Sequence, residues 1–297
     1  MILGAHMSIA GGYYRSLDSG HENGCDCVQL FTKNNNQWRA KPITPEDVDR
    51  FQAAKEEYGY VHTLSHASYL INMGSPKDEL REKSIDAMVE ELKRAHLLGV
   101  PLVVVHPGSF TTSTEADGIK RIGESIDLVH DAAGDICSRL LLETTAGQGT
   151  NLGWRFEQLA GMLDACDSSD RVGICCDTCH MFAAGYAMGT EAEWSDTWQQ
   201  FDDILGLNKL LAFHLNDSKK EFGSRKDRHE HIGQGFMGID PFRYLMNDNR
   251  FSHIPMYLET AKGDADGEHE GLTWDQVNLQ VLRSLQQKPA GIPRDQV

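Results

Sequence analysis

Five short apolar runs in this chain end at side chains that bind metal ions or carry protons. The runs are VVVHPG at His106, LLLET at Glu143, GICCDTCH at Asp177 and His180, LAFHLND at His214, and MYLET at Glu259. Imidazole and carboxylate groups are common zinc ligands. A buried carboxylate without a partner is costly, and a metal ion is the simplest compensation. Together the runs predict a polynuclear metal centre assembled from several strand ends.

Such a centre needs strands whose ends meet, and the pattern supplies eight. We expect strands near residues 2–6, 27–31, 61–66, 102–106, 139–143, 172–177, 210–214 and 254–259. Helical patterns separate them, which favours βα units and a parallel sheet. In a closed (β/α)₈ barrel, catalytic groups lie where the strands end. We therefore predict an α/β, single-domain TIM barrel over residues 1–287 with its active site at the C-terminal strand ends, and a flexible tail over 288–297.

Helix starts are marked by capping residues and prolines. Thr44 and Ser75 each precede a proline and early acidic residues, and Asp240 is followed by a proline. Between residues 78 and 98 the apolar positions share one face, and Gly99 supplies a stop.

Bulk composition bounds the class of protein. The chain has 297 residues, of which 40% are hydrophobic, enough for one large barrel core. It holds no apolar stretch of roughly 20 residues, and no secretory signal is visible at its start. The seven cysteines are odd in number, and several lie in apolar runs, as expected of free thiols. We expect a cytoplasmic protein.

Charge is unevenly placed. The formal net charge is −16, which taken alone argues against a nucleic-acid partner. The stretch FTKNNNQWRAK, however, carries Lys33, Arg39 and Lys41 beside Trp38 without an acid, and the loop 218–228 is also rich in cations. Both stretches follow strand ends and are expected to rim the same mouth. Two basic loops on the catalytic face of an acidic protein favour a polyanionic substrate.

Some histidines leave more than one interpretation open. His66 ends the third strand, where a lone histidine is more often a hydrogen-bonded core residue. His229 in KDRHEH has a close competitor in His231. His6, at the end of the first strand, is expected either to contact substrate or to support the ligands, or to do neither. A GxGxxG beginning at Gly233 follows a polar loop, so it is not interpreted as a dinucleotide site.

The residues resemble one family over nearly the whole chain. The segments GAHMSIAGG, FTKNNNQW, HASYLINMG, VVHPGS, ETTAGQGTNLG, GICCDTCH, HLNDSKKEFGSRKDRHEHIG and LET occur in the order typical of endonuclease IV, the zinc-dependent apurinic/apyrimidinic endonucleases. The resemblance implies a barrel with three zinc ions per chain that cuts double-stranded DNA 5′ to abasic sites. The expected products are a 3′ hydroxyl and a 5′ deoxyribose phosphate. Clearing of blocked 3′ ends is also expected.

The resemblance also implies a ligand set. One ion would be held by His66, His106 and Glu143, a second by Glu143, Asp177, His214 and Glu259, and a third by His180, Asp227 and His229. Glu143 would bridge two ions and hold the nucleophilic hydroxide. The carboxylate-rich second site could also accept manganese.

DNA contacts are implied by the same resemblance together with the basic loop. The expected residues are Asn35, Asn36, Gln37, Trp38, Tyr69, Arg225 and Arg228. Asn36 stands where family members can have an arginine, so the segment that would enter the duplex is expected to be either weaker or differently built. We expect a monomer.

The alternative is a sugar isomerase or epimerase of the xylose-isomerase-like barrels with a single divalent metal. Such a site needs only Glu143, Asp177, His214 and Glu259. The additional histidines and the two basic loops favour the nuclease.

Overall fold

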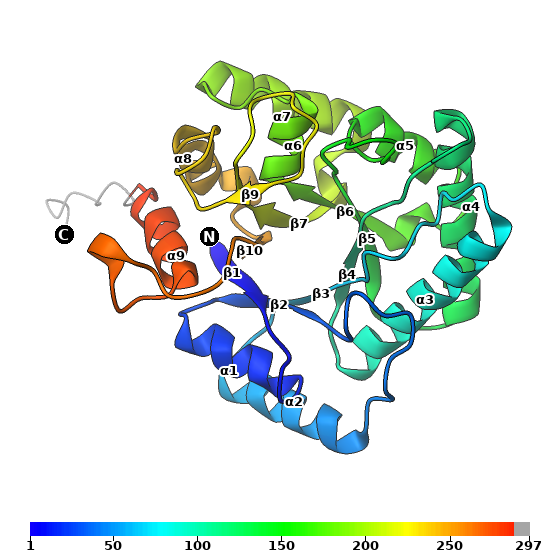
Figure 1. Cartoon of the computed structure of the whole chain (residues 1–297), viewed down its shortest axis with the longest axis horizontal. Coiled ribbons are helices and arrows are strands. Elements are labelled where there is room, and N and C mark those ends of the chain that lie inside the picture. The colour runs from blue at the N-terminus through cyan, green and yellow to red at the C-terminus, as the bar shows by residue number, and fades with distance from the viewer. Residues whose placement is uncertain (288–297) are drawn as a thin grey trace, which may run out of the picture.

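The eight predicted strands close into one parallel barrel (Figure 1). The computed structural model describes residues 1–287. The barrel strands are β1 Ile2–Met7, β2 Cys27–Phe31, β3 Thr63–His66, β4 Leu102–Val105, β5 Arg139–Glu143, β6 Val172–Asp177, β7 Leu210–Leu215 and β10 Pro255–Leu258. Around the barrel the order is β1-β10-β7-β6-β5-β4-β3-β2. The predicted single-domain TIM barrel is confirmed. The predicted boundary at 287 coincides with the limit of the described residues, and the predicted tail 288–297 lies outside them.

Helices surround the strands in chain order, from α1 (blue) to α9 (red) in Figure 1. Within residues 1–287 they are α1 Tyr14–Glu22, α2 Pro45–Glu57, α3 Asp78–Leu97, α4 Glu115–Ala133, α5 Phe156–Asp164, α6 Thr178–Ala184, α7 Glu191–Leu205, α8 Asp240–Asn247 and α9 Trp274–Ser284. Short 3-10 turns lie in the connections, namely η1 Ser169–Arg171, η2 Leu207–Lys209, η3 Asn249–Phe251 and η4 Gly267–His269. Among the described helices, none combines the length and apolarity required to cross a bilayer.

Two of the three predicted helix starts are confirmed. Thr44 caps α2 through a capping box, and α8 begins at Asp240. The prediction that Ser75 caps α3 is wrong. The helix begins at Asp78, and its N-cap position is Lys77, which has no side-chain cap. Ser75 Oγ instead accepts the Lys77 N–H in the preceding turn, at 3.2 Å.

An apolar layer inside the barrel fixes where the polar side chains point. Seven strands contribute one buried residue each to it: Cys27, Leu64, Val104, Leu141, Cys175, Ala212 and Tyr257. In β1 the corresponding residue is Gly4, where a Cβ would lie 1.7 Å from the carbonyl oxygen of the neighbouring Cys27. Side chains two residues apart on a strand share a face. Two residues beyond this layer stand His6, Gln29, His66, His106, Glu143, Asp177, His214 and Glu259.

Candidate metal centre

All nine predicted metal ligands come together at the carboxyl ends of the barrel strands. They form three groups, which are His66, His106 and Glu143; then Glu143, Asp177, His214 and Glu259; then His180, Asp227 and His229. Within each group the possible ligand atoms lie within 4.8 Å of one another. Glu143 belongs to two groups, as a bridging carboxylate must. Their role as ligands stays a prediction.

Glu143 lies at the middle of the centre and is fully buried. Its Oε1 is 2.9 Å from His214 Nδ1, and its Oε2 is 3.3 Å from His66 Nε2 and 3.2 Å from His106 Nε2. Oε2 has no hydrogen-bond partner. A buried oxygen without a donor is costly. An anionic oxygen left unpaired between two imidazole nitrogens fits a metal cation.

Main-chain carbonyls orient three of the histidines. The Nδ1 atoms of His66, His180 and His229 lie 2.7, 2.8 and 3.3 Å from carbonyl oxygens of neighbouring loops. A carbonyl only accepts, so each Nδ1 carries the proton. The lone pair of each Nε2 is then available to the centre, as in metal-bound histidines held by an outer hydrogen bond.

The third group is assembled by short local structure. The Asp177 carboxylate caps α6 by accepting the His180 N–H at 2.7 Å, which places His180 above the same strand end. The small antiparallel sheet of β8 (Asp217–Ser218) and β9 (His229–Glu230) brings His229 back toward it. Asp227 Oδ1 lies 3.2 Å from His229 Nε2, and its Oδ2 lies 3.2 Å from His180 Nε2.

The charges of the centre are strongly coupled. Burial alone would raise the pKa of Glu143. The neighbouring His214 and His106 outweigh this effect and hold the pKa of Glu143 well below its usual range. Burial likewise opposes the ionisation of Glu259, yet His214 brings the pKa of Glu259 down to about 2. Burial lowers the pKa of His229, and Asp177 more than reverses this, raising that pKa to about 9. Glu143 and Glu259 are therefore anionic, and their negative charge favours cations in the centre.

Two amide side chains that the sequence analysis missed hold the ligands. Gln29 Oε1 lies 2.7 Å from His214 Nε2, and its Nε2 donates to Glu259 Oε1 at 2.5 Å. His214 Nε2 therefore carries the proton, which leaves Nδ1 for the centre. Asn216 donates to Asp177 Oδ2 at 2.7 Å and accepts the Glu259 N–H at 3.0 Å. The period of two along β2 could have identified Gln29.

His6 supports this arrangement. Its Nδ1 lies 2.9 Å from Gln29 Nε2, and its ring centroid lies 4.4 Å from that of Phe31. Burial lowers the pKa of His6 to about 3, so the ring is neutral and Nδ1 accepts from the amide. Of the interpretations left open for His6, the structure favours support of the ligands.

Two other polar residues near the site have different partners. His231, the competitor of His229, stacks on Trp274 with ring centroids 3.9 Å apart and lies outside the three groups. Asp217 accepts the N–H groups of Gly235 and Met237 at 2.9 and 3.0 Å, so it shapes the loop after β9. The tight packing of this loop explains a glycine of the GxGxxG motif, since a Cβ on Gly235 would lie 2.4 Å from the Ser218 carbonyl oxygen.

The loop after β2 and the segment after β3 carry most of the predicted DNA contacts. Asn36 and Gln37 are exposed and Asn35 is partly exposed. Tyr69 is 52% exposed, and its ring centroid lies 4.9 Å from that of His66, over the centre. The DNA contact predicted for Trp38 stays a prediction. Its ring is partly buried against the core, with Lys83 Nζ 4.4 Å from the ring centroid, so it also anchors the loop.

Fewer basic side chains face the mouth of the barrel than predicted. Lys33 is buried, and its Nζ lies 3.2 Å from Glu91 Oε1, so its charge does not face the mouth. Arg225 is exposed, and its guanidinium stacks 3.8 Å from the centroid of the Trp154 ring. Arg228 borders the centre.

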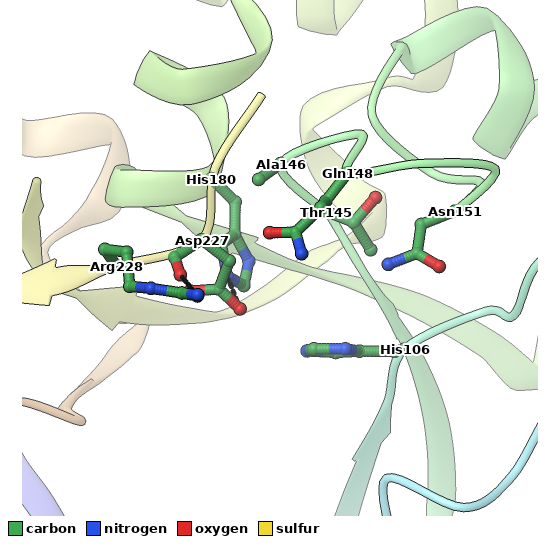
Figure 2. A pocket seen from close by; sticks show the side chains of 8 residues that line it. All are labelled: His106, Thr145, Ala146, Gln148, Asn151, His180, Asp227 and Arg228. Carbon is green, nitrogen blue, oxygen red and sulfur yellow. Dashed lines mark hydrogen bonds and ion pairs between the residues drawn. The ribbon is translucent and has the colours of Figure 1, made fainter. Parts of the chain in front are cut away.

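A cavity of about 150 Å³ opens directly beside the ligands. Figure 2 shows its lining, which is His106, Thr145, Ala146, Gln148, Asn151, His180, Asp227 and Arg228. The amides of Gln148 and Asn151 face this space from the loop after β5, opposite Arg228. Amides and a guanidinium beside a metal-binding cluster suit an anionic, oxygen-rich group.

Comparison with known proteins identifies the family. A family model described as "Xylose isomerase-like TIM barrel" matches residues 17–285. A protein named "Probable endonuclease 4" from Trichlorobacter lovleyi is 47% identical over 283 residues, which are 95% of this chain and 99% of the relative. The chain belongs to the endonuclease IV family. Membership makes it a hydrolase and an endonuclease, and the predicted family and enzyme class are confirmed.

Solved structures agree with endonuclease IV. The crystal structure of endonuclease IV from Thermus thermophilus superposes with a TM-score of 0.83 at 35% identity, covering 96% of this chain and 98% of that one. A D-tagatose 3-epimerase-like protein reaches a TM-score of 0.71 at 18% identity, covering 96% of this chain and 97% of that one. The second likeness shows the shared fold alone. The closer identity to the endonuclease IV proteins decides against the sugar isomerase.

Proposed function

We propose that this endonuclease hydrolyses the phosphodiester bond 5′ to abasic sites in double-stranded DNA. The products are a 3′ hydroxyl and a 5′ deoxyribose phosphate, and the same centre clears blocked 3′ ends. The observation that carries the proposal is the unpaired, buried Oε2 of Glu143 between two imidazoles, in a carboxylate shared by two ligand groups. A polynuclear centre beside a cavity whose amides and guanidinium suit an anionic group fits phosphodiester cleavage.

The donor set fits three zinc ions, one for each group described above. Manganese is an alternative in the group that contains Asp177, His214 and Glu259. Bound zinc supplies a water of lowered pKa, about 7, and positive charge for the attacking and leaving oxygens. With four carboxylates against three divalent ions, the loaded centre carries a charge of about +2, which favours a phosphate.

The chain's own side chains prepare the centre for this substrate. Main-chain carbonyls and the Gln29 amide fix the histidine tautomers in advance, so no reorganisation accompanies the reaction. At the cavity, Arg228 neutralises phosphate charge while Gln148 and Asn151 donate to its oxygens. Glu143 stays ionised throughout, because its histidine neighbours hold its pKa low.

Selection of the abasic site is assigned to the exposed residues of the two loops. A nucleotide without a paired base costs the least to extrude. Asn36 and Gln37 would enter the duplex from the loop after β2, and Tyr69 would cover the centre from the segment after β3. Arg225 and Arg228 would contact the backbone. The seven free cysteines agree with the proposed cytoplasmic location, and we propose that the enzyme acts as a monomer.

The proposal is tested by the chemistry of the cut ends. A duplex with a single abasic site is labelled at its 5′ end, incubated with the zinc-loaded enzyme, and then offered to a DNA polymerase. Cleavage 5′ to the site leaves a 3′ hydroxyl that the polymerase extends, while an undamaged duplex stays intact. A nick on the 3′ side of the site, or product ends that are not extended, contradicts the proposal.

A further inference from the structure

A buried carboxylate joins the two segments that carry the exposed residues. Glu91 is only 1% exposed, although it lies on the outer helix α3 and not on a barrel strand. Its Oε2 accepts the Thr32 hydroxyl at 2.8 Å, immediately after β2. Its Oε1 accepts the Ser68 N–H at 3.1 Å and lies 3.2 Å from Lys33 Nζ. One side chain thus contacts the loop after β2 and the residue that precedes Tyr69.

Further contacts fix the backbone of the loop after β2. Arg94, one turn along α3 from Glu91, donates to the carbonyl oxygens of Thr32 at 2.6 Å and Lys41 at 2.8 Å. Lys33 Nζ donates to the Gln37 carbonyl at 3.1 Å. Loops of this length are commonly mobile. Here carbonyls at both ends and at the centre of the loop are held by buried cations.

A direct hydrogen bond also links the two segments. Ser68 Oγ donates to the Asn35 carbonyl oxygen at 2.6 Å. The same Ser68 is bound through its N–H to Glu91. The exposed Asn36 and the exposed Tyr69 are therefore each adjacent in sequence to a residue in this network.

The network is organised around charge. The Lys33 and Glu91 side chains are 3% and 1% exposed. Removing one partner of a buried pair leaves the other charge without compensation, so loss of the Glu91 charge is expected to weaken the contacts to both segments.

We propose that Glu91 is a positioning residue for recognition of the abasic site, setting the loop after β2 and the Ser68–Tyr69 segment at one fixed separation. This inference rests on the proposed function. It assigns selectivity for damaged DNA to a side chain on an outer helix that contacts neither the metal centre nor the duplex.

The test is Glu91→Gln in the full-length, zinc-loaded enzyme. Glutamine keeps the shape of glutamate, but it removes the charge opposite Lys33 and replaces one of the two accepting oxygens with an amide group that only donates. We expect the preference for an abasic over an undamaged duplex, measured as the ratio of Kd values, to fall about tenfold, as for the loss of one charged hydrogen bond. Hydrogen exchange is expected to rise together at residues 33–41 and 68–70.

Two readouts separate positioning from damage to the centre. Bound zinc and hydrolysis of bis(4-nitrophenyl) phosphate, which needs no duplex recognition, are expected to stay within about twofold of wild type, a change worth only a few tenths of a kcal/mol. Glu82→Gln is the matched control, because Glu82 is an exposed glutamate on the same helix and lies outside this network. It is expected to keep the full preference.

The inference is overturned if Glu91→Gln keeps the full preference, or if zinc content and small-substrate hydrolysis fall in parallel with it. Should that variant not fold, Ser68→Ala removes the direct link to Asn35 and a longer contact from the Leu70 N–H, while the Ser68 N–H can still donate to Glu91. It is expected to lower the preference about threefold, and an unchanged preference again overturns the inference. A wild-type enzyme without activity on abasic DNA would instead refute the proposed function.

Discussion

At the scale of single residues, the centre depends on which oxygen and nitrogen atoms are left without partners. Glu143 Oε2 is buried and unpaired, while His66 and His214 beside this carboxylate have their other ring nitrogen already bound. The sequence indicated six of the nine predicted ligands because they end apolar runs, where a polar side chain is costly unless it has a partner. Asp227 and His229, in a polar loop, were predicted from the family resemblance. Gln29 and Asn216 were missed because an amide is not a typical metal ligand; the period of two along β2 points Gln29 toward the centre, but only the fold shows which residues the two amides contact.

The residue-scale prediction concerns Glu143. Glu143→Ala removes the ligand shared by two groups, and we expect cleavage of abasic DNA to fall by at least about a thousandfold, as for residues that act as one catalytic unit. Circular dichroism is expected to show the barrel retained. Glu157→Ala, in the exposed first turn of α5, serves as the control and should cleave normally. Near-wild-type cleavage by the Glu143 variant would remove the basis for a bridging role.

At the scale of elements, hydrophobic patterning carried most of the information. All eight barrel strands were predicted, because strands buried on both faces are continuous apolar runs. The periodicity of α3 predicted its apolar face but not that Glu91 and Arg94 are also buried. Charged residues are expected to be solvated unless their partners are known, and the backbone and hydroxyl partners described above lie between 23 and 62 residues away in sequence. The error for Lys33 has the same cause.

A pH prediction belongs to the packing of α4. His130 Nδ1 lies 2.6 Å from Ser168 Oγ, which itself donates to Asp127 at 2.7 Å, tying α4 to the segment before β6. Burial, assisted by the charge of Arg171, lowers the pKa of His130 to about 4. The unfolded chain therefore binds more protons between pH 4 and 6.5. Stability is full above pH 6.5 and is lost as the pH falls through this window.

His130→Asn keeps a donor to Ser168 but does not titrate. We expect its free energy of unfolding to change less between pH 7 and pH 5 than that of wild type, by roughly 1–2 kcal/mol. Chemical denaturation of both proteins at each pH measures the difference, in which effects of metal loss cancel. Equal pH dependence in the two proteins would show that this histidine is not the titrating group.

At the scale of the whole molecule, an acidic protein binds an acidic polymer. The net charge is −16, while Arg225 and Arg228 lie on the loop between β8 and β9 that also carries Asp227, a predicted ligand. Affinity for abasic DNA is therefore expected to fall as salt rises. Releasing counterions from only two phosphates weakens binding about tenfold between about 50 and 200 mM salt. Fluorescence anisotropy checks this, and a Kd independent of salt would contradict the assignment of the basic loop.

The most direct test of the account is to follow zinc content and cleavage in one preparation. The purified enzyme is assayed on a labelled abasic duplex as isolated, after removal of metal with a strong chelator, and after return of zinc. With one ion for each of the three ligand groups, we predict about three zinc ions per chain, loss of cleavage with the metal and recovery on its return. Full cleavage by the metal-free protein, or by protein holding a single divalent ion, would contradict the trinuclear centre.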